Sequence, residues 1–219
     1  EIRKSLVGSE MCIRDRLTAN LLEKSGVDRV LAMDLHSAQI QGYFDIPCDH
    51  IYGSPVLIDY LESLDLEEIV VVSPDVGGVA RARAFAKLMN DAPLAIIDKR
   101  RAAHNIAESL TVIGEVKGKT AILIDDMIDT GGTICSGANL LKKEGANRIF
   151  ACASHAVFSP PSHERLSSKN LFEQVIVTNS IPVIYKDNFP QLKVLSVANM
   201  LGEAIWRIHE ESSVSSMFR

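Results

Sequence analysis

The chain contains few cysteines, and their spacing matches no metal-site or disulfide pattern. The 219 residues contain four cysteines, Cys12, Cys48, Cys135 and Cys152, and no two of them form a C-x-x-C pair. This spacing predicts neither a zinc site nor a disulfide framework, and it favours a reducing compartment. We expect Cys135 and Cys152 to be small buried apolar residues.

Long apolar runs and excess positive charge are also missing. No apolar run is long enough to span a bilayer, and the formal net charge is −5. A general attraction to nucleic acid or to an anionic membrane is therefore not expected. No secretory signal is visible, although the chain starts at Glu1 and not at Met, so a leader can be missing. We expect a cytoplasmic protein, with an organelle such as a plastid as the alternative.

The hydrophobic content of 47% is enough for a sizeable core, and it is arranged as alternating strand-like and helical runs. Short continuous apolar runs predict buried strands at 29–35, 68–74, 93–98, 119–126, 148–157 and 173–179. Helices are predicted at 17–24, 56–64, 79–90, 133–144 and 198–210, and Gly26 and Gly145 supply stop signals after two of them. This alternation predicts the α/β class, with a mainly parallel sheet covered on both faces.

The first sixteen residues lack clear periodicity. We interpret residues 1–16 as an unmatched segment that arises as an artefact of sequence assembly, and no expectation depends on them.

The run "KTAILIDDMIDTGGT" (119–133) carries the strongest functional signal. An apolar strand ends in two acids, Asp125 and Asp126, and a third acid, Asp129, opens a small-residue loop that leads into a helix. Backbone N–H groups at a helix N-terminus bind phosphate, and glycines allow its close approach. Within the loop, the hydroxyls of Thr130 and Thr133 can add hydrogen-bond donors.

A sugar phosphate accounts for both halves of this run. Asp125 and Asp126 can accept hydrogen bonds from sugar hydroxyls, while the following loop holds the phosphate. The alternative is a strand that ends in capping acids and a glycine turn. The full order of strand, acids, loop and helix favours the functional interpretation.

Two further clusters predict metal and anion chemistry at strand ends. In "MDLHSAQIQGYFD" (33–45), Asp34 and His36 follow a strand, and neutral imidazole is a common metal ligand. His50, His155, His163 and His209 are given a structural role, because a lone histidine is more often structural. In "SPDVGGVARAR" (73–83), Asp75 precedes two glycines and a helix, where it can orient Mg²⁺. Arg81 and Arg83 follow, and at least one of them is expected to be an ordinary solvated helix residue.

A basic cluster follows another predicted strand in "IIDKRRAAHN" (96–105). Lys99, Arg100 and Arg101 are consecutive, and the residues after them are typical of a loop. A basic triplet on a loop is usually solvated surface. Beside a metal–phosphate site, it can instead neutralise charge that develops during phosphoryl transfer.

Four of these segments resemble one family when they are taken in order. "DLHSAQIQGYFDIP", "SPDVGGVARAR", "IIDKRRAAHNIAE" and "ILIDDMIDTGGT" are similar to ribose-phosphate pyrophosphokinase, also called phosphoribosyl pyrophosphate synthetase. The tail "IWRIHEESSVSSMF" also resembles the end of that family. The resemblance runs from about Leu17 to the C-terminus and is closest to the phosphate-dependent, allosterically regulated class.

The resemblance implies transfer of the diphosphoryl group of Mg-ATP to O1 of ribose 5-phosphate, which gives phosphoribosyl pyrophosphate and AMP for nucleotide biosynthesis. It implies a phosphoribosyltransferase-like (type I) fold, Mg²⁺ as cofactor and a homo-oligomer in the full-length family. It assigns Asp125 and Asp126 to the ribose hydroxyls, Asp129, Thr130, Gly131, Gly132 and Thr133 to the 5-phosphate, His36 and Asp75 to Mg-ATP, and Lys99 and Arg101 to catalysis.

The resemblance departs from the family in two ways. Many members have Ala where Gly131 stands and His where Val76 stands, and both changes keep the chemistry of the turns. Members also have a whole preceding domain that contributes adenine contacts. We therefore interpret residues 17–50, with the C-terminal helix at about 190–219, as a remnant of that domain, and 51–189 as the domain with the ribose-phosphate site. Such a fragment is expected to expose a sheet edge, to hold only part of the ATP site and to have little activity.

The tail and two rival functions complete the set of hypotheses. By resemblance, Ser213 and Ser215 belong to a regulatory anion site for inorganic phosphate and ADP, and a frayed polar terminus is the alternative. A phosphoribosyltransferase uses the same loop, but Lys99, Arg101 and "DLHSAQIQGYFD" argue against it. A non-catalytic regulatory homologue should have lost some catalytic residues, whereas all of those named above are present.

Overall fold

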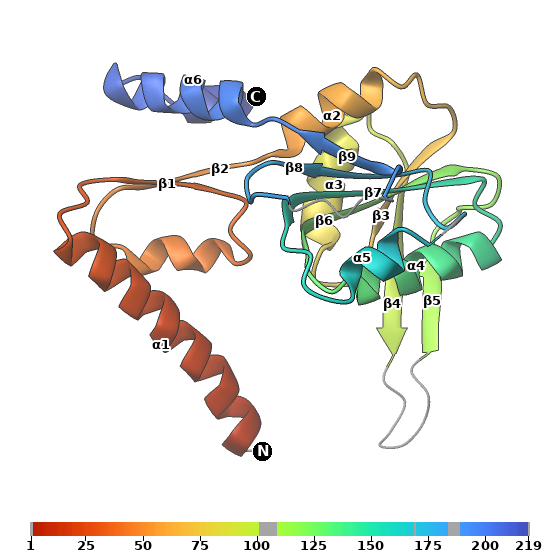
Figure 1. Cartoon of the computed structure of the whole chain (residues 1–219), viewed down its shortest axis with the longest axis horizontal. Helices are drawn as coiled ribbons and strands as arrows, with labels where there is room; N and C mark the ends of the chain where they lie inside the picture. The colour runs from red at the N-terminus through yellow and green to blue at the C-terminus, as the bar shows by residue number, and fades with distance from the viewer. Residues whose placement is uncertain (1, 101–108, 169, 184–188, 219) are drawn as a thin grey trace. The chain divides into compact units, whose positions relative to one another are not determined.

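The structure is a computed structural model that describes residues 2–100, 109–168, 170–183 and 189–218. The chain divides into two compact units (Figure 1). The first comprises Glu1–Tyr52 and Glu203–Arg219, and the second comprises Gly53–Gly202.

The second unit is built on a seven-stranded sheet with the order β5-β4-β3-β6-β7-β8-β9. Its strands are β3 (Ile69–Ser73), β4 (Leu94–Arg100), β5 (Ser109–Ile113), β6 (Thr120–Ile128), β7 (Arg148–Ala156), β8 (Gln174–Thr178) and β9 (Leu192–Leu195). All neighbouring pairs are parallel except β4 and β5, which are antiparallel. The predicted α/β class with a mainly parallel sheet is thus confirmed.

Helices cover both faces of this sheet, because its central strands are apolar on both sides. α2 (Ser54–Glu62) and α3 (Val79–Leu88) pack on one face around Ile122, Ile124 and Phe150. α4 (Gly132–Lys143) and α5 (Ser162–Leu166) lie together on the other face (Figure 1), where they enclose a second core around Leu123 and Leu141. Parallel strands separated by helices place the carboxyl ends of the strands at one edge of the sheet.

All six predicted strands are present, and all their ends fall within two residues of the structure, with β4 and β6 each extending two residues beyond the predicted end. Three short strands, β2 (Cys48–Ile51), β5 and β9, were not predicted, and neither was α5. The missed strands mix polar and apolar residues over four or five positions, which gives too little periodicity to distinguish a strand from a loop.

Two helix ends follow the predicted stop signals. Gly26 has φ +94° and Gly145 has φ +87°, and both lie directly beyond helix ends. These left-handed conformations suit glycine, which has no Cβ to clash.

The first unit contains a two-stranded parallel sheet of β1 (Val30–Met33) and β2. It also contains α1 (Ile2–Lys24), the 3₁₀ turns η1 (Ala38–Tyr43) and η2 (Ser215–Phe218), and the last residues of α6 (Ala198–His209). α1 starts well before the predicted helix at 17–24, since no proline interrupts residues 2–16. On α1, Ile13, Leu17 and Leu21 are spaced by four residues and are more than half exposed.

The expected burial of Cys135 and Cys152 is confirmed. Cys48, Cys135 and Cys152 are free thiols, and the last two are buried. Burial raises the pKa of Cys152 well above its usual range and that of Cys135 to about 11, so both are expected to stay protonated. Among the described helices, none combines the length and the apolar character that a transmembrane span requires.

The core beneath α4 should dominate the stability of the second unit. Leu141 is fully buried there, so Leu141→Ala should lower the free energy of unfolding by about 3 kcal/mol through lost burial and a residual cavity. Leu88 on α3 is 47% exposed, so Leu88→Ala should change it by less than about 0.5 kcal/mol. Urea unfolding followed by circular dichroism measures both, and equal losses would contradict this view of the core.

Candidate functional site

Two adjacent carboxylates lie near the end of β6 and share one cation. The side chain of Asp125 is 22% exposed and that of Asp126 only 2%. Arg81, in the first turn of α3, places Nη1 3.0 Å from Asp125 Oδ1 and 3.4 Å from Asp126 Oδ1. The sequence left open whether Arg81 or Arg83 is merely solvated. In the structure Arg83 is exposed, and Arg81 forms the centre of this cluster.

The acid pair is only partly neutralised by Arg81. Burial, together with neighbouring Asp126, raises the pKa of Asp125 to about 7, although Arg81 acts in the opposite direction. The backbone N–H of Asp126 also donates to Asp125 Oδ1 at 2.9 Å. A ligand that donates hydroxyl hydrogens to Asp125 would favour its ionised form and relieve this cost of burial.

The loop 129–133 leads from β6 into α4 as predicted. Asp129, Thr130 and Thr133 are exposed, and Gly131 adopts the left-handed conformation at φ +72°. No side chain caps the N-terminus of α4, and its first turn carries no acid. The first N–H groups of the helix are therefore available to an anion, with the positive end of the helix dipole behind them.

α5 contacts this loop, a feature that the sequence did not reveal. Arg165 Nη1 donates to the Thr130 carbonyl at 3.1 Å. Leu166 is fully buried, and its Cγ would lie 3.3 Å from a Cβ at Gly131. The two residues belong to a five-residue helix after a pair of prolines, and no sequence pattern connects them to the distant loop.

The turn after β3 holds Asp75 in the predicted place. Asp75 is exposed, and its Oδ1 accepts the Gly78 N–H at 2.8 Å, while Ser73 Oγ donates to the Asp75 carbonyl at 2.6 Å. This carboxylate therefore orders the start of α3, and its exposure leaves it accessible to a ligand. Gly78 has no room for a Cβ, which would lie 2.9 Å from Ser73 Oγ.

Lys99 is exposed and lies inside β4, where it pairs with Leu110 of β5. The sequence placed Lys99 and Arg100 beyond a strand that ends at 98, and this boundary is wrong. The strand continues to Arg100 because β5 supplies an antiparallel partner for its last residues. Arg101 lies outside the described residues.

In the first unit, Asp34 and His36 follow β1 as predicted. His36 is exposed, whereas Asp34 is buried and adopts a positive φ of 43°. His50 has the structural role that was expected, because its Nε2 accepts the Leu35 N–H at 3.0 Å. Burial lowers the pKa of His50, in keeping with a neutral ring that accepts this bond.

The hydroxyls of Ser213 and Ser215, near the C-terminus, lie 2.9 Å apart. Arg207 is next to them, since its Nη1 donates to the Ser213 carbonyl at 3.2 Å and to Ser216 Oγ at 2.6 Å. The segment is thus organised around a cation. Whether it binds a regulatory anion stays a prediction.

Three of the predicted clusters share the carboxyl edge of the second unit's sheet. β4, β3 and β6 are neighbours and run parallel, so Lys99, Asp75 and Asp125 all follow or end strands at that edge. No group of three or more His, Cys, Asp or Glu side chains that could hold a metal occurs among the described residues.

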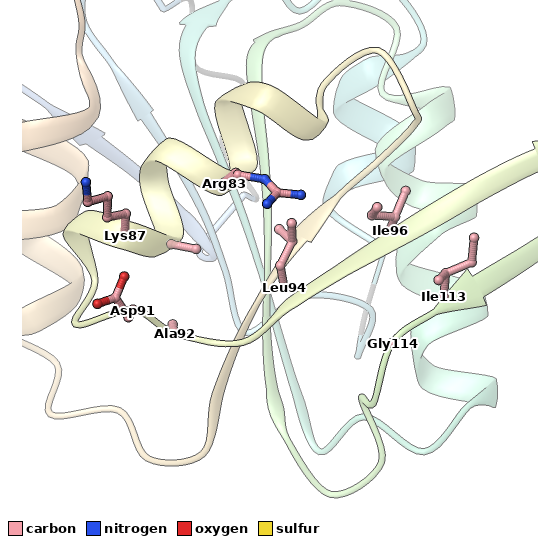
Figure 2. A pocket seen from close by; sticks show the side chains of 9 residues that line it. Arg83, Lys87, Asp91, Ala92, Leu94, Ile96, Ile113 and Gly114 are labelled. Atoms are coloured by element: carbon pink, nitrogen blue, oxygen red, sulfur yellow. The ribbon is translucent and has the colours of Figure 1, made fainter.

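A separate cavity of about 460 Å³ contains none of the predicted site residues. Figure 2 shows Arg83 and Lys87 on α3 beside it, together with Leu94 and Ile96 on β4 and Ile113 on β5. It lies by the last turn of α3 and the start of β4, which is away from the strand ends that carry the acids.

Comparison with known proteins identifies the family of the chain. The model of the phosphoribosyl synthetase-associated domain matches residues 100–219, more than half of the chain. The chain belongs to that family. Two curated relatives of this synthetase-family chain are ribose-phosphate pyrophosphokinases. One is from Prochlorococcus marinus subsp. pastoris, 93% identical over 207 residues, and one, named ribose-phosphate pyrophosphokinase 1, is from Spinacia oleracea, 63% identical over 209 residues.

The resemblance drawn from the sequence is thereby confirmed, but it covers part of the relatives. Each alignment includes 94% of this chain and 62% of the relative, so the synthetase-family chain spans about three fifths of the length of these proteins. The crystal structure of phosphoribosylpyrophosphate synthetase from Mycobacterium smegmatis is similar with a TM-score of 0.83 and 44% identity. That similarity covers 91% of this chain and 65% of the crystallised one.

Asp125 should make the stability of the synthetase-family chain depend on pH. Its folded-state pKa lies above its usual value, so the folded state binds more protons between about pH 4 and pH 7, and stability from this carboxyl falls as pH rises through that window. Asp125→Asn should therefore raise the melting temperature at about pH 8, with the gain shrinking toward about pH 4. Asp59→Asn, on the exposed surface of α2, is the control. A gain for Asp125→Asn that does not vary with pH would rule out this explanation.

Arg81 and Arg83 form a matched pair on one helix. Arg81→Gln leaves two partly buried carboxylates without their cation, so it should cost about 2 kcal/mol at about pH 8 and less at about pH 5, where Asp125 binds a proton. Arg83→Gln removes the same charge from an exposed position and should cost little at either pH. Urea unfolding at the two pH values measures the difference, and similar losses for the two variants would contradict the role of Arg81.

Proposed function

We propose that the second unit binds ribose 5-phosphate, and that the chain belongs to a ribose-phosphate diphosphokinase. The reaction would transfer the diphosphoryl group of Mg-ATP to O1 of the sugar, with phosphoribosyl pyrophosphate and AMP as products. One observation carries the proposal: an acid pair near the end of β6 is followed, after two more strand residues, by a loop into an uncapped helix N-terminus. The names of the relatives support the same reaction.

The loop 129–133 is proposed to hold the 5-phosphate. Backbone N–H groups from Gly132 onward can donate to phosphate oxygens, and the hydroxyls of Thr130 and Thr133 are exposed beside them. Gly131 and Gly132 allow the phosphate to approach the backbone. The carboxylate of Asp129, which opens this loop, is assigned to the same subsite by the family resemblance.

Asp125 and Asp126 are proposed to hold the ribose hydroxyls. Asp125 is the more accessible of the two, so it is the better placed to meet the ligand directly. Arg81 lowers the net negative charge of the pair, which reduces repulsion of the incoming phosphate. The acids thus position the sugar while the helix N-terminus fixes its phosphate.

Lys99 and Arg101 are proposed to stabilise the transferring group. In the transfer, O1 forms a bond to the β-phosphorus of ATP, the bond from that phosphorus to the α-phosphate oxygen breaks, and O1 loses its proton. Negative charge accumulates on the phosphoryl oxygens, and cations placed beside them lower the barrier. Lys99 is exposed at the carboxyl edge of the sheet, which is the edge that also carries the proposed sugar-phosphate site.

His36 and Asp75 are each proposed, on the family resemblance, to serve the Mg-ATP side. Mg²⁺ usually keeps several waters and takes one or two carboxylates together with substrate phosphates, so an exposed Asp75 suits it without a larger protein cluster. When bound, the ion would neutralise charge on the phosphates of ATP.

Two further assignments complete the proposal. Residues 17–50, with the C-terminal helix, are proposed to derive from a domain that precedes this one in the full-length family, whose members assemble as homo-oligomers. Ser213 and Ser215, beside Arg207, are proposed to form a regulatory site for inorganic phosphate and ADP.

Binding of the sugar and of the phosphate can be separated experimentally. Asp125→Ala should weaken ribose 5-phosphate binding about tenfold, because hydrogen bonds to the sugar hydroxyls are lost, while inorganic phosphate binding should change little. Titration calorimetry in Mg²⁺ buffer measures both ligands, with Asp59→Ala as an exposed control. If both ligands lose affinity equally, the acid maintains the loop conformation and does not bind the sugar.

A further inference from the structure

α5 contacts the loop 129–133 through two consecutive side chains. The apolar one, Leu166, is buried against Gly131. The charged one, Arg165, donates from Nη1 to the Thr130 carbonyl, and the same nitrogen would lie 3.3 Å from a Cβ at Gly132. The guanidinium therefore lies against the backbone that opens α4, even though it comes from a segment more than thirty residues later in the chain.

Arg165 is exposed, and its charge lies where a bound anion would be favoured. Helix N-termini carry partial positive charge, so a cation beside one is destabilising. The first turn of α4 contains no acidic side chain to offset it. Among the described residues, the Thr130 carbonyl is the hydrogen-bond acceptor of Arg165, and no carboxylate forms an ion pair with it. Cys135 lies in the first turn of α4, and Arg165 acts to lower its pKa, although burial raises it by more. The positive charge of Arg165 is therefore felt at that turn.

A second polar group on α5 also has an unmet requirement. Ser162 is fully buried, and its Oγ has no hydrogen-bond partner among the described residues. Ser162 and Leu166 are four residues apart, so they lie on the same side of α5. Buried hydroxyls are almost always paired, so the unpaired Ser162 is an exception among the described residues.

We infer that Arg165 is a ligand-contacting residue of this loop, and that it helps the loop select the phosphorylated sugar over the free sugar. The inference rests on the proposed function, because it deepens the 5-phosphate subsite. A guanidinium has five N–H donors, and the Thr130 carbonyl uses one of them. The remaining donors can face the same phosphate oxygens as the N–H groups of α4. One side chain then fixes the loop and completes its anion site.

The test compares neutral variants of Arg165 with a matched loss of charge elsewhere. Arg165→Gln and Arg165→Met remove the guanidinium from the site. Arg148→Gln removes the same charge at the start of β7, which is the opposite edge of the sheet, where Arg148 forms an exposed ion pair with Glu173. Titration calorimetry with ribose 5-phosphate and with ribose, in Mg²⁺ buffer, gives the affinities. Thermal unfolding by circular dichroism establishes which variants fold.

The expected result is a loss of about tenfold in ribose 5-phosphate affinity for either neutral variant, with Arg148→Gln unchanged. The loss should shrink at high salt and at about pH 5, where the phosphate carries less charge. Without ligand, melting temperatures should change little, because the lost hydrogen bond to the Thr130 carbonyl is offset by the removal of a cation from a helix N-terminus.

Three results would overturn the inference. One is unchanged ribose 5-phosphate affinity in a folded Arg165 variant, which leaves the proposed function standing. Another is an equal loss with Arg148→Gln, which would show a general effect of charge. The third is failure of both neutral variants to fold, which would make Arg165 a structural residue. If the unmodified chain binds no ribose 5-phosphate, the proposed function itself is wrong.

Discussion

Arg81 makes it possible for two carboxylates to occupy the end of a buried strand. Without a cation, adjacent acids at the end of β6 would have to lose charge or become more exposed, because each opposes the ionisation of the other. Arg81 can reach them because α3 starts directly after the turn held by Asp75. The position of the acids thus depends on the geometry of the neighbouring strand β3 and of the turn after it. The acid pair and this turn form one structural unit.

Much of this fold could be predicted from the sequence, because strands such as 68–74 and 148–157 are continuous apolar runs between amphipathic helices. Their alternation determines the parallel order of the central strands. β5 and β9 were missed for a physical reason. They are edge strands with mixed polarity, and they acquire their conformation from pairing with β4 and β8. Pairing between strands cannot be detected in a single short segment of sequence.

In the candidate site, the parts that are continuous in sequence could be predicted, and the parts that depend on distant segments could not. The loop 129–133 follows from local order along the chain, and its placement before α4 was correct. Arg81 and Arg165 could not be found in this way. One looks like any arginine on an amphipathic helix, and the other lies far from the loop in sequence. Their roles arise from distances of 3.0 to 3.4 Å that only the folded chain creates.

The antiparallel pairing of β4 and β5 has a consequence for the entropy of the chain between them. Arg100 and Ser109 are register partners, so the two ends of the intervening segment are held about 5 Å apart by the ladder itself. The entropic cost of bringing these two ends together is offset by the pairing of β4 and β5. Evolution can therefore change the length and composition of this segment at little cost to folding, since loop-closure entropy rises only slowly with length.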